Sequence, residues 1–249
     1  MLLENRVALV FGALGLAGSA ITRDLCAQGA TVVASARRET EGESLAAELV
    51  SAGHQASFKQ ADVTSREQVT KVVDETVAEH GQLDILVNAF SVDHLRRFLD
   101  DDEKYWDAML DTNLKGLFYS CHAALQHMTK KDYGRIINLT SDSGKIGASM
   151  ETVQAATKAG TIGFSKSLAR EMARHTITVN AVCMGPTRPT AEAPEGFSEE
   201  GWKSFMRLTP FHRPALPAEV AGLVRFLASS EGSFVTGQAV SVSGGLTMC

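Results

Sequence analysis

GRIINLTSDSGKIGASMETVQAATKAGTIGFSKSLAR, residues 134–170, has the pattern of a buried strand, a hydroxyl-rich loop and a long helix. Ile136 and Ile137 form the centre of the strand, and Ser141 stands at its carboxyl end. Gln154 and Lys158 are four residues apart, so they lie on one face of a helix that opens near residue 151. Because ligands bind at the carboxyl ends of the strands in an open parallel sheet, the stretch predicts an α/β fold with a site near Ser141.

Strand-like and helix-like segments alternate along the whole chain, which predicts one α/β domain over residues 1–249. The chain is 44% hydrophobic and contains no linker-like tract and no internal repeat. We expect a Rossmann-like, doubly wound sheet of about seven mostly parallel strands, flanked by helices on both faces. Residues 186–216 form a proline-rich segment that is long enough to be a substrate loop.

The charge and the cysteines exclude several classes of function. The net charge is −5 with both signs interspersed, which excludes a nucleic-acid footprint and a polybasic membrane patch. The amino-terminal residues lack the apolar core of a signal peptide, and no run approaches the ~18 apolar residues of a membrane span. The four cysteines have no C-x-x-C spacing, so we expect no metal site and a cytoplasmic protein.

Three glycines follow the first predicted strand, residues 7–11, where a helix begins. Gly12, Gly15 and Gly18 lie in this turn, and a helix amino terminus can hold a phosphate group there. Their spacing, G-x-x-G-x-x-G, differs from the dinucleotide fingerprint G-x-G-x-x-G. Two interpretations stay open, a phosphate cradle and a tight turn that simply needs glycine. After the second strand, Arg37 either favours a nucleotide with a 2′-phosphate, as in NADP(H), or is a solvated surface charge.

The chain resembles the short-chain dehydrogenase/reductase family over its whole length. In that family an active serine is followed thirteen residues later by a tyrosine and four residues after that by a lysine, and Ser141 and Lys158 keep this register. Asn113, 28 residues before Ser141, falls on the family's active asparagine. The tyrosine position is Gln154, whose amide cannot titrate. Loss of a positioned general acid costs on the order of 10²–10⁴ in rate.

The same resemblance implies an NAD(P) cleft along the carboxyl edge of the sheet. The cofactor-binding positions fall on Gly12, Gly15, Gly18, Arg37, Asp62, Val63, Asn88, Gly185 and Thr187. Some residues in this cleft depart from the family pattern, since Phe11 replaces a threonine, Leu16 a glycine and Phe90 a small residue. We expect the bulk of Leu16 and Phe90 to crowd the cleft, so that binding of NADP(H) is weak or lost.

Three other titratable side chains could replace the missing tyrosine. Glu151 lies one turn before Gln154, Asp142 follows Ser141, and His94 lies in the loop after the fourth predicted strand. Each also has a simpler explanation. A carboxylate is favourable at a helix amino terminus, an aspartate suits an S-D-S-G turn, and a loop histidine is commonly just exposed.

The helix after Asn113 carries an apolar stripe that predicts contacts between subunits. Its members are Leu117, Phe118, Cys121, Ala124, Leu125 and Met128. The stripe is wider than one buried face needs. The resemblance implies that this helix and the Lys158 helix form a four-helix subunit interface, and a plain core stripe is the alternative.

Three functions follow from the resemblance. The first is a non-catalytic subunit of a hetero-oligomeric NAD(P)-dependent dehydrogenase, paired with a complete homologous subunit in a heterotetramer. The family's heteromeric pairs include one in anaerobic benzylsuccinyl-CoA β-oxidation, which implies an acyl-CoA β-hydroxy or β-keto substrate from aromatic degradation. The second is an active NADP(H)-dependent oxidoreductase, a homotetramer that acts on a small molecule through an atypical acid. The third is a non-redox lyase or isomerase that uses Asp142 or Glu151.

Overall fold

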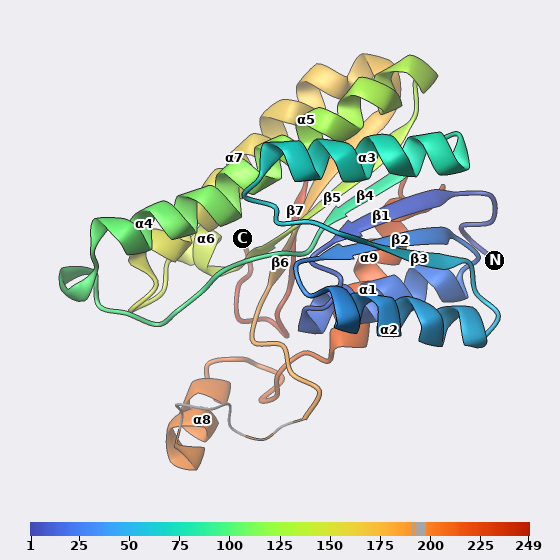
Figure 1. Ribbon diagram of the computed structural model, residues 1–249. Coiled ribbons are helices and arrows are strands. Elements are labelled where there is room, and N and C mark those ends of the chain that lie inside the picture. Colours follow the sequence, from blue (N-terminus) through green and yellow to red (C-terminus); the bar gives the residue numbers. More distant parts are fainter. Residues whose placement is uncertain (191, 193–197) are drawn as a thin grey trace.

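Seven strands form one sheet in the computed structural model, which describes residues 1–190, 192 and 198–249 (Figure 1). The strands are β1 (Val7–Phe11), β2 (Thr31–Ala36), β3 (Ala56–Gln60), β4 (Ile85–Asn88), β5 (Gly134–Ser141), β6 (Ile177–Met184) and β7 (Ala239–Val242). Their order is β3-β2-β1-β4-β5-β6-β7, and every neighbouring pair is parallel. The strand order reverses between β1 and β4, which is where doubly wound folds bind ligands. The predicted fold class is confirmed.

Helices cover both faces of the sheet (Figure 1). One face carries α1 (Leu16–Ala27), α2 (Glu39–Ser51) and α9 (Pro217–Ala228), and the other carries α3 (Arg66–His80), α5 (Gly116–Met128) and α7 (Thr152–Met172). The shorter helical elements are η1 (Phe98–Asp100), α4 (Glu103–Leu110), η2 (Asp111–Lys115), η3 (Thr129–Lys131), α6 (Ser143–Ile146), η4 (Ala173–His175) and α8 (Glu199–Met206). In β1, Ala8 and Val10 pack toward the first face, and Leu9 and Phe11 toward the second. Because both faces are buried at the centre of the sheet, β1 is a continuous apolar run rather than an alternating one.

The apolar stripe on α5 belongs mainly to the core. Five of its six members are buried: Leu117, Cys121, Ala124, Leu125 and Met128. They pack in the same apolar cluster as α3 and the sheet, which cover α5 from two sides. Phe118 is 41% exposed, and its ring lies 5.0 Å from that of Phe164 on α7, measured between centroids. The core interpretation therefore accounts for most of the stripe, and Phe118 is left for contacts outside the chain.

The predicted substrate loop, residues 186–216, contains the helix α8, which lies away from the sheet (Figure 1). Residues 191 and 193–197 of this loop lie outside the described residues. Trp202 of α8 is buried, and its ring lies 5.9 Å from that of Phe205. At the base of the loop, Thr187 pairs with Ala215 in a parallel bridge. The two ends of the loop are therefore held together, while α8 has its own small apolar contact.

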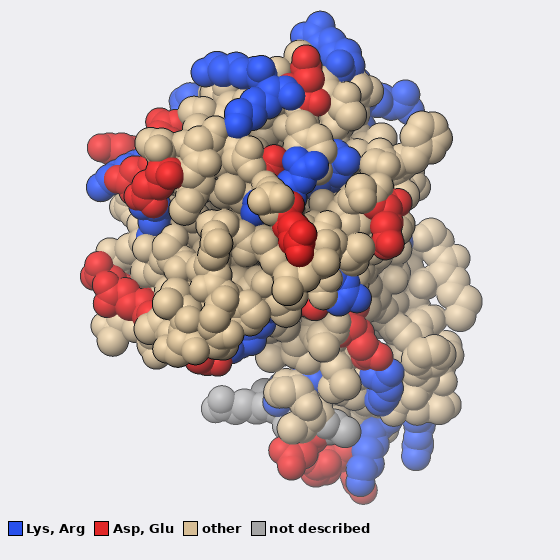
Figure 2. Space-filling model, turned by 90° about the vertical axis from the view of Figure 1, so that its right-hand side faces the viewer, with Lys and Arg blue, Asp and Glu red and all other residues tan. Residues whose placement is uncertain are grey.

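Charges of both signs are interspersed on the face shown in Figure 2. Within the described ranges, none of the helices combines the length and the apolar character that a bilayer crossing requires. No three His, Cys, Asp or Glu side chains are grouped as metal ligands in the part of the chain that the structure describes. All four cysteines are free thiols, and Cys26, Cys121 and Cys183 are buried whereas Cys249 is exposed.

Candidate active site and nucleotide cleft

The turn between β1 and α1 is built on glycines that the backbone packing requires. Gly12 has a φ of +79°, and a Cβ there would lie 2.6 Å from the carbonyl carbon of Ala89. A Cβ on Gly18 would lie 2.1 Å from the carbonyl oxygen of Gly12. Gly15 precedes α1, and its N–H donates to the Gly12 carbonyl at 3.0 Å. Close packing alone explains Gly12 and Gly18, while Gly12 and Gly15 also border a pocket.

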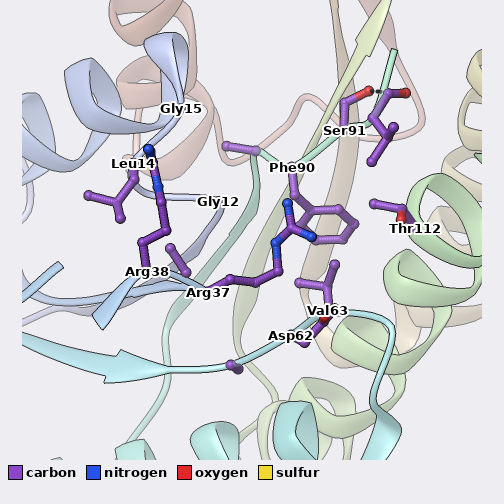
Figure 3. A pocket seen from close by; sticks show the side chains of 14 residues that line it. Gly12, Leu14, Gly15, Arg37, Arg38, Asp62, Val63, Phe90, Ser91 and Thr112 are labelled. Atoms are coloured by element: carbon purple, nitrogen blue, oxygen red, sulfur yellow. Dashed lines mark hydrogen bonds between the residues drawn. The ribbon is translucent and has the colours of Figure 1, made fainter. Parts of the chain in front are cut away.

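This pocket lies at the carboxyl ends of β1, β2, β3 and β4 and has a volume of ≈ 220 Å³ (Figure 3). It is lined by Gly12, Leu14, Gly15, Ala36, Arg37, Arg38, Ala61, Asp62, Val63, Ala89, Phe90, Ser91, Val92 and Thr112. Of the predicted cofactor positions, the structure brings together Gly12, Gly15, Arg37, Asp62 and Val63. The pocket is therefore the place where a nucleotide would enter the fold.

Two arginines stand at one end of the pocket. Arg38 Nη1 pairs with Glu41 Oε2 at 3.0 Å. Arg37 is exposed, and among the described residues no carboxylate lies within ion-pair distance of it. A planar guanidinium without a partner suits recognition of a phosphate group. The arginine end thus fits a nucleotide with a 2′-phosphate, such as NADP(H).

The two bulky residues expected to crowd the cleft behave differently. Leu16 is 44% exposed on the first turn of α1 and does not line this pocket, so the crowding expected from Leu16 stays a prediction. Phe90 does line the pocket. Its ring lies against α5, since a Cβ on Gly116 would be 3.2 Å from Phe90 Cε2. Phe90 therefore fills space at the β4 end of the cleft, as the sequence predicts.

Ser141 is the last residue of β5 and is held by the loop that follows. Ser141 Oγ accepts hydrogen bonds from the N–H of Ser143 at 3.2 Å and from its hydroxyl at 3.1 Å. Burial raises the pKa of Glu151, which the Ser143 side chain and the charge of Lys158 oppose. Ser141 and Glu151 thus share Ser143 as a neighbour.

Lys158 is a buried cation whose hydrogen bond goes to a serine on another loop. Only 6% of Lys158 is exposed, and its Nζ donates to Ser91 Oγ at 2.7 Å. Burial lowers the pKa of Lys158 to about 8, and the nearby carboxylates of Asp93 and Glu151 oppose this shift. At neutral pH the group is therefore mainly an ammonium, which is hydrogen-bonded to one hydroxyl and attracted by two carboxylates.

Asn113 lies in the π-helical turn η2 and ties three segments together. Its Oδ1 accepts from the Val92 N–H at 2.9 Å, and its Nδ2 donates to the Val92 carbonyl at 3.0 Å. Nδ2 also lies 3.3 Å from Thr157 Oγ1, next to Lys158 in α7. π-helical turns are frequent at functional sites. In this chain the amide of Asn113 fixes the β4 loop at Val92.

Gln154 is 6% exposed and lies one turn before Lys158 on α7. Its backbone carbonyl accepts from Thr157 Oγ1 at 2.8 Å. The predicted placement of the two side chains on one helix face is consistent with both being buried. The amide of Gln154 can donate or accept a hydrogen bond, but it cannot transfer a proton as a tyrosine does.

Several predicted site residues do not reach the pocket. Asn88 is buried and donates to Asn138 Oδ1 at 2.9 Å, so it joins β4 to β5 inside the core. Thr187 Oγ1 donates to the Gly185 carbonyl at 3.0 Å, and Gly185 packs against Ser243, where a Cβ would lie 2.6 Å from the Ser243 Cβ. Gly18 is likewise absent from the pocket lining, because it packs on the turn itself.

The two other acid candidates are also placed by the structure. The carboxylate of Asp142 is buried and accepts from Ser241 Oγ at 2.6 Å, and Lys145 Nζ donates to the same hydroxyl at 2.9 Å. His94 is exposed, and its carbonyl accepts from Tyr105 Oη at 3.0 Å. Asp142 therefore anchors the loop to β7, and neither residue lines the pocket.

Sequence reasoning missed the role of Ser91 as the partner of Lys158. The available signal was the residue type, because Ser91 stands where the resembled family has a glycine that carries no hydroxyl. Asp93, two residues further on, was missed as well, although its carboxylate acts on the pKa of both Lys158 and Glu151. Both residues lie in the loop after β4, whose course depends on tertiary contacts.

A parallel sheet with a glycine turn, an arginine after β2 and a serine and a lysine near the β5 edge is the scaffold of a nucleotide-dependent oxidoreductase. The family model described as enoyl-(acyl carrier protein) reductase matches residues 12–247. The chain is 38% identical to an acetoacetyl-CoA reductase of Acinetobacter sp. (strain RA3849), over 98% of this chain and 99% of that protein. It belongs to the short-chain dehydrogenase/reductase family.

Two further relatives are similar along their whole lengths. Nodulation protein G of Rhizobium meliloti (strain 1021) is 38% identical over 99% of this chain and 98% of that protein. A 3-oxoacyl-(acyl-carrier-protein) reductase of Thermotoga maritima is 36% identical over all of both chains. Family membership and the oxidoreductase scaffold are thereby confirmed, whereas the non-catalytic role, the cofactor and the heteromeric partner stay predictions.

Proposed function

We propose that this chain is a non-catalytic subunit of a hetero-oligomeric short-chain dehydrogenase whose other subunit is a catalytically complete relative. One observation carries the proposal. The position of the family's proton-transferring tyrosine is Gln154, and the lysine one turn later donates to Ser91 at 2.7 Å. Neither an amide nor a lysine held in this way supplies the proton that a carbonyl oxygen needs when hydride reaches its carbon.

The substrate class follows from the names of the relatives. Acetoacetyl-CoA and 3-oxoacyl-(acyl-carrier-protein) are both thioesters of 3-oxo acids, so we assign the complex an acyl thioester with a 3-oxo or 3-hydroxy group. The predicted acyl-CoA of aromatic degradation belongs to this class. NADP(H), when bound, would supply or accept the hydride, and in this chain Arg37, Asp62 and Val63 line the pocket for it.

The partner surface that fits this proposal is the exposed side of the second helical layer. Phe118 on α5 is 41% exposed and its ring packs at a tilt of 42° against that of Phe164 on α7, and Trp106 and Leu110 on α4 are also partly exposed. Interfaces built from equivalent helices accept a related chain wherever the same patch is retained. The assembly proposed is a heterotetramer in the cytoplasm, with a homotetramer as the alternative.

The decisive experiment is purification of the untreated complex from the native host, followed by native mass spectrometry. A second chain of similar mass is expected, and NADP(H)-dependent turnover of a 3-oxoacyl thioester is expected only when that chain is present. Adding back the separated subunits should restore the activity. Recovery of a homo-oligomer that turns over the substrate alone would refute the proposal.

A second function is favoured by the names of the relatives and by Glu151. In this reading the chain is an active NADP(H)-dependent oxidoreductase, and Glu151 transfers the proton in place of the tyrosine. Burial raises the pKa of its carboxyl, and Ser143 and the charge of Lys158 oppose this shift. A preparation that contains this chain alone should then reduce acetoacetyl-CoA, and Glu151→Gln should lower that rate at least 100-fold. A preparation with no turnover would contradict this second function. Turnover that is unchanged in Glu151→Gln would exclude Glu151 as the acid and would refute the first function as well.

A further inference from the structure

The loop after β4 closes a ring of hydrogen bonds around two predicted catalytic residues. Lys158 Nζ donates to Ser91 Oγ at 2.7 Å, and Ser91 Oγ lies 3.3 Å from the Val92 carbonyl, to which it donates. The same carbonyl accepts from Asn113 Nδ2 at 3.0 Å, and Asn113 reaches back to Thr157, the neighbour of Lys158 in α7. Lys158 and Asn113 therefore find their partners within the chain.

Ser91 stands between the pocket and the ammonium. Ser91 and Val92 line the pocket, and Ser91 is exposed (Figure 3). Lys158 is 6% exposed and does not line it. The hydroxyl of Ser91 uses its hydrogen toward Val92 and a lone pair toward Lys158. A ligand that enters the pocket therefore meets a hydroxyl that is already engaged, not a free ammonium.

The two ends of the cleft also differ in charge. The arginine end has Arg37 and Arg38 and suits an anion. At the other end the groups that face Lys158 are the carboxylates of Asp93 from the β4 loop and Glu151 from the start of α7. The charge of Lys158 is therefore offset by two carboxylates, and this end offers a phosphate or ribose group little attraction.

We propose that Ser91 is a blocking residue, which confines ligand binding in this chain to the arginine end of the cleft and to an adenosine nucleotide that carries a 2′-phosphate. The rest of a dinucleotide then adds nothing to the affinity. Removal of the hydroxyl frees the one N–H of the Lys158 ammonium that points at the pocket side for a ligand hydroxyl, a charge-assisted bond that corresponds to about tenfold in affinity. This inference concerns the chain's own cleft and holds whether or not a partner chain exists.

The test is calorimetric titration of the chain with two probes, NADPH and adenosine 2′,5′-bisphosphate. For the unchanged chain the two dissociation constants are expected to agree within about threefold. In Ser91→Gly and in Ser91→Ala, NADPH should bind about tenfold more tightly while the affinity for the bisphosphate stays constant. Arg37→Ala should weaken both probes, and Ser233→Gly, on an exposed turn, should change neither.

Two results would overturn the inference. One is NADPH binding at least tenfold more tightly than the bisphosphate to the unchanged chain, and the other is no binding of the bisphosphate at all. Alanine at position 91 does not add the backbone freedom that glycine would. A folded Ser91→Ala variant without a gain in NADPH affinity would therefore also overturn the inference, even if Ser91→Gly is unstable. The dissociation constants are measured independently of the mass of the assembly. The blocking role of Ser91 and the proposed partner subunit can therefore be refuted independently of each other.

Discussion

The β1–β3 end and the β4–β5 end of the same sheet edge satisfy their polar groups in different ways. At the first end the backbone closes tightly on Gly12 and Gly18 and leaves a pocket with Arg37, which has no ion-pair partner among the described residues. At the second end Lys158 and Asn113 are bonded to the loop at Ser91 and Val92. One end of the sheet edge thus keeps room for a ligand, whereas at the other end the polar side chains are hydrogen-bonded within the chain. Substitutions can therefore change ligand binding and proton transfer separately.

The largest expected effect tests the packing at the first end. Gly18→Ala should lower the free energy of unfolding by about 3 kcal/mol, because its Cβ would meet the Gly12 carbonyl oxygen at 2.1 Å and both atoms belong to the backbone. The matched control is Gly53→Ala. Gly53 has a φ of +86° but no atom within 4 Å, so only about 1 kcal/mol should be lost. Equal losses of unfolding free energy for the two variants, measured by urea unfolding, would show that backbone strain and not packing determines the effect of Gly18→Ala.

The next effect tests the closed ring at the second end. Asn113→Leu should cost about 2 kcal/mol of unfolding free energy, because it removes both hydrogen bonds to the Val92 backbone and leaves the Val92 N–H without a partner. Gln60→Leu, at the first end, removes one exposed bond to the Arg37 carbonyl and should cost less than about 0.5 kcal/mol. A loss at Gln60 as large as that at Asn113 would remove the contrast between the two ends.

A third, smaller effect appears as a pH dependence. Burial holds the pKa of Lys158 near 8, below its ordinary 10.5, so above pH 8 the folded chain has released a proton that the unfolded chain still binds. Between pH 8 and 9 this should add up to about 1.4 kcal/mol to the free energy of unfolding of the unchanged chain relative to that of Lys158→Met. Lys166→Met, on the exposed side of α7, should keep this contribution.

The buried thiols act in the opposite direction from about pH 8 upward, which is why the effect of Lys158 is measured as a difference from Lys158→Met. Burial raises the pKa of Cys26 and of Cys183 to about 11 and that of Cys121 to about 12. The unfolded chain then loses protons that the folded chain keeps, so stability falls as pH rises. Identical slopes for the unchanged chain and Lys158→Met below pH 9 would show that the lysine is not desolvated.

The smallest expected effect is a substitution that leaves the catalytic activity unchanged. Gln154→Tyr alone should not create measurable reduction of acetoacetyl-CoA by NADPH, since Ser91 still holds the lysine and proton transfer is useless without a positioned hydride donor. The double variant Gln154→Tyr with Ser91→Gly is the one expected to show turnover. The sequence alone pointed to Leu16→Gly as the second change, but Leu16 does not line the pocket. Turnover by Gln154→Tyr alone would show that the cleft already positions the hydride donor beside residue 154 while Ser91 is present.

The fold could be predicted from the sequence because its signals are local. Runs such as Val7–Phe11 and the pair Ile136 and Ile137 are apolar on both faces, which in an alternating α/β chain indicates a parallel sheet. The spacing of Gln154 and Lys158 likewise needs only helix geometry. The placement of the individual catalytic positions thus followed from the pattern, although their roles are still predictions.

The rest of the site depends on contacts between segments far apart in the chain. Ser91 and Lys158 are 67 residues apart, and nothing in either segment alone indicates that the two side chains meet. The width of the α5 stripe was misleading for a similar reason, because cover by α3 and the sheet together is a property of the assembled layers. Leu16 lies outside the pocket lining for a similar reason, since residue size does not tell where a side chain at a helix start is directed.

The cysteines make the chain convenient to label at one place. The three thiols in the core are shielded and weakly acidic, so a maleimide dye at neutral pH should react only with Cys249. The Cys249 carbonyl accepts from Lys145 Nζ at 2.9 Å, which places the dye beside the loop that follows Ser141. A fluorophore attached there would report docking of another chain or filling of the cleft in real time, without any engineered cysteine.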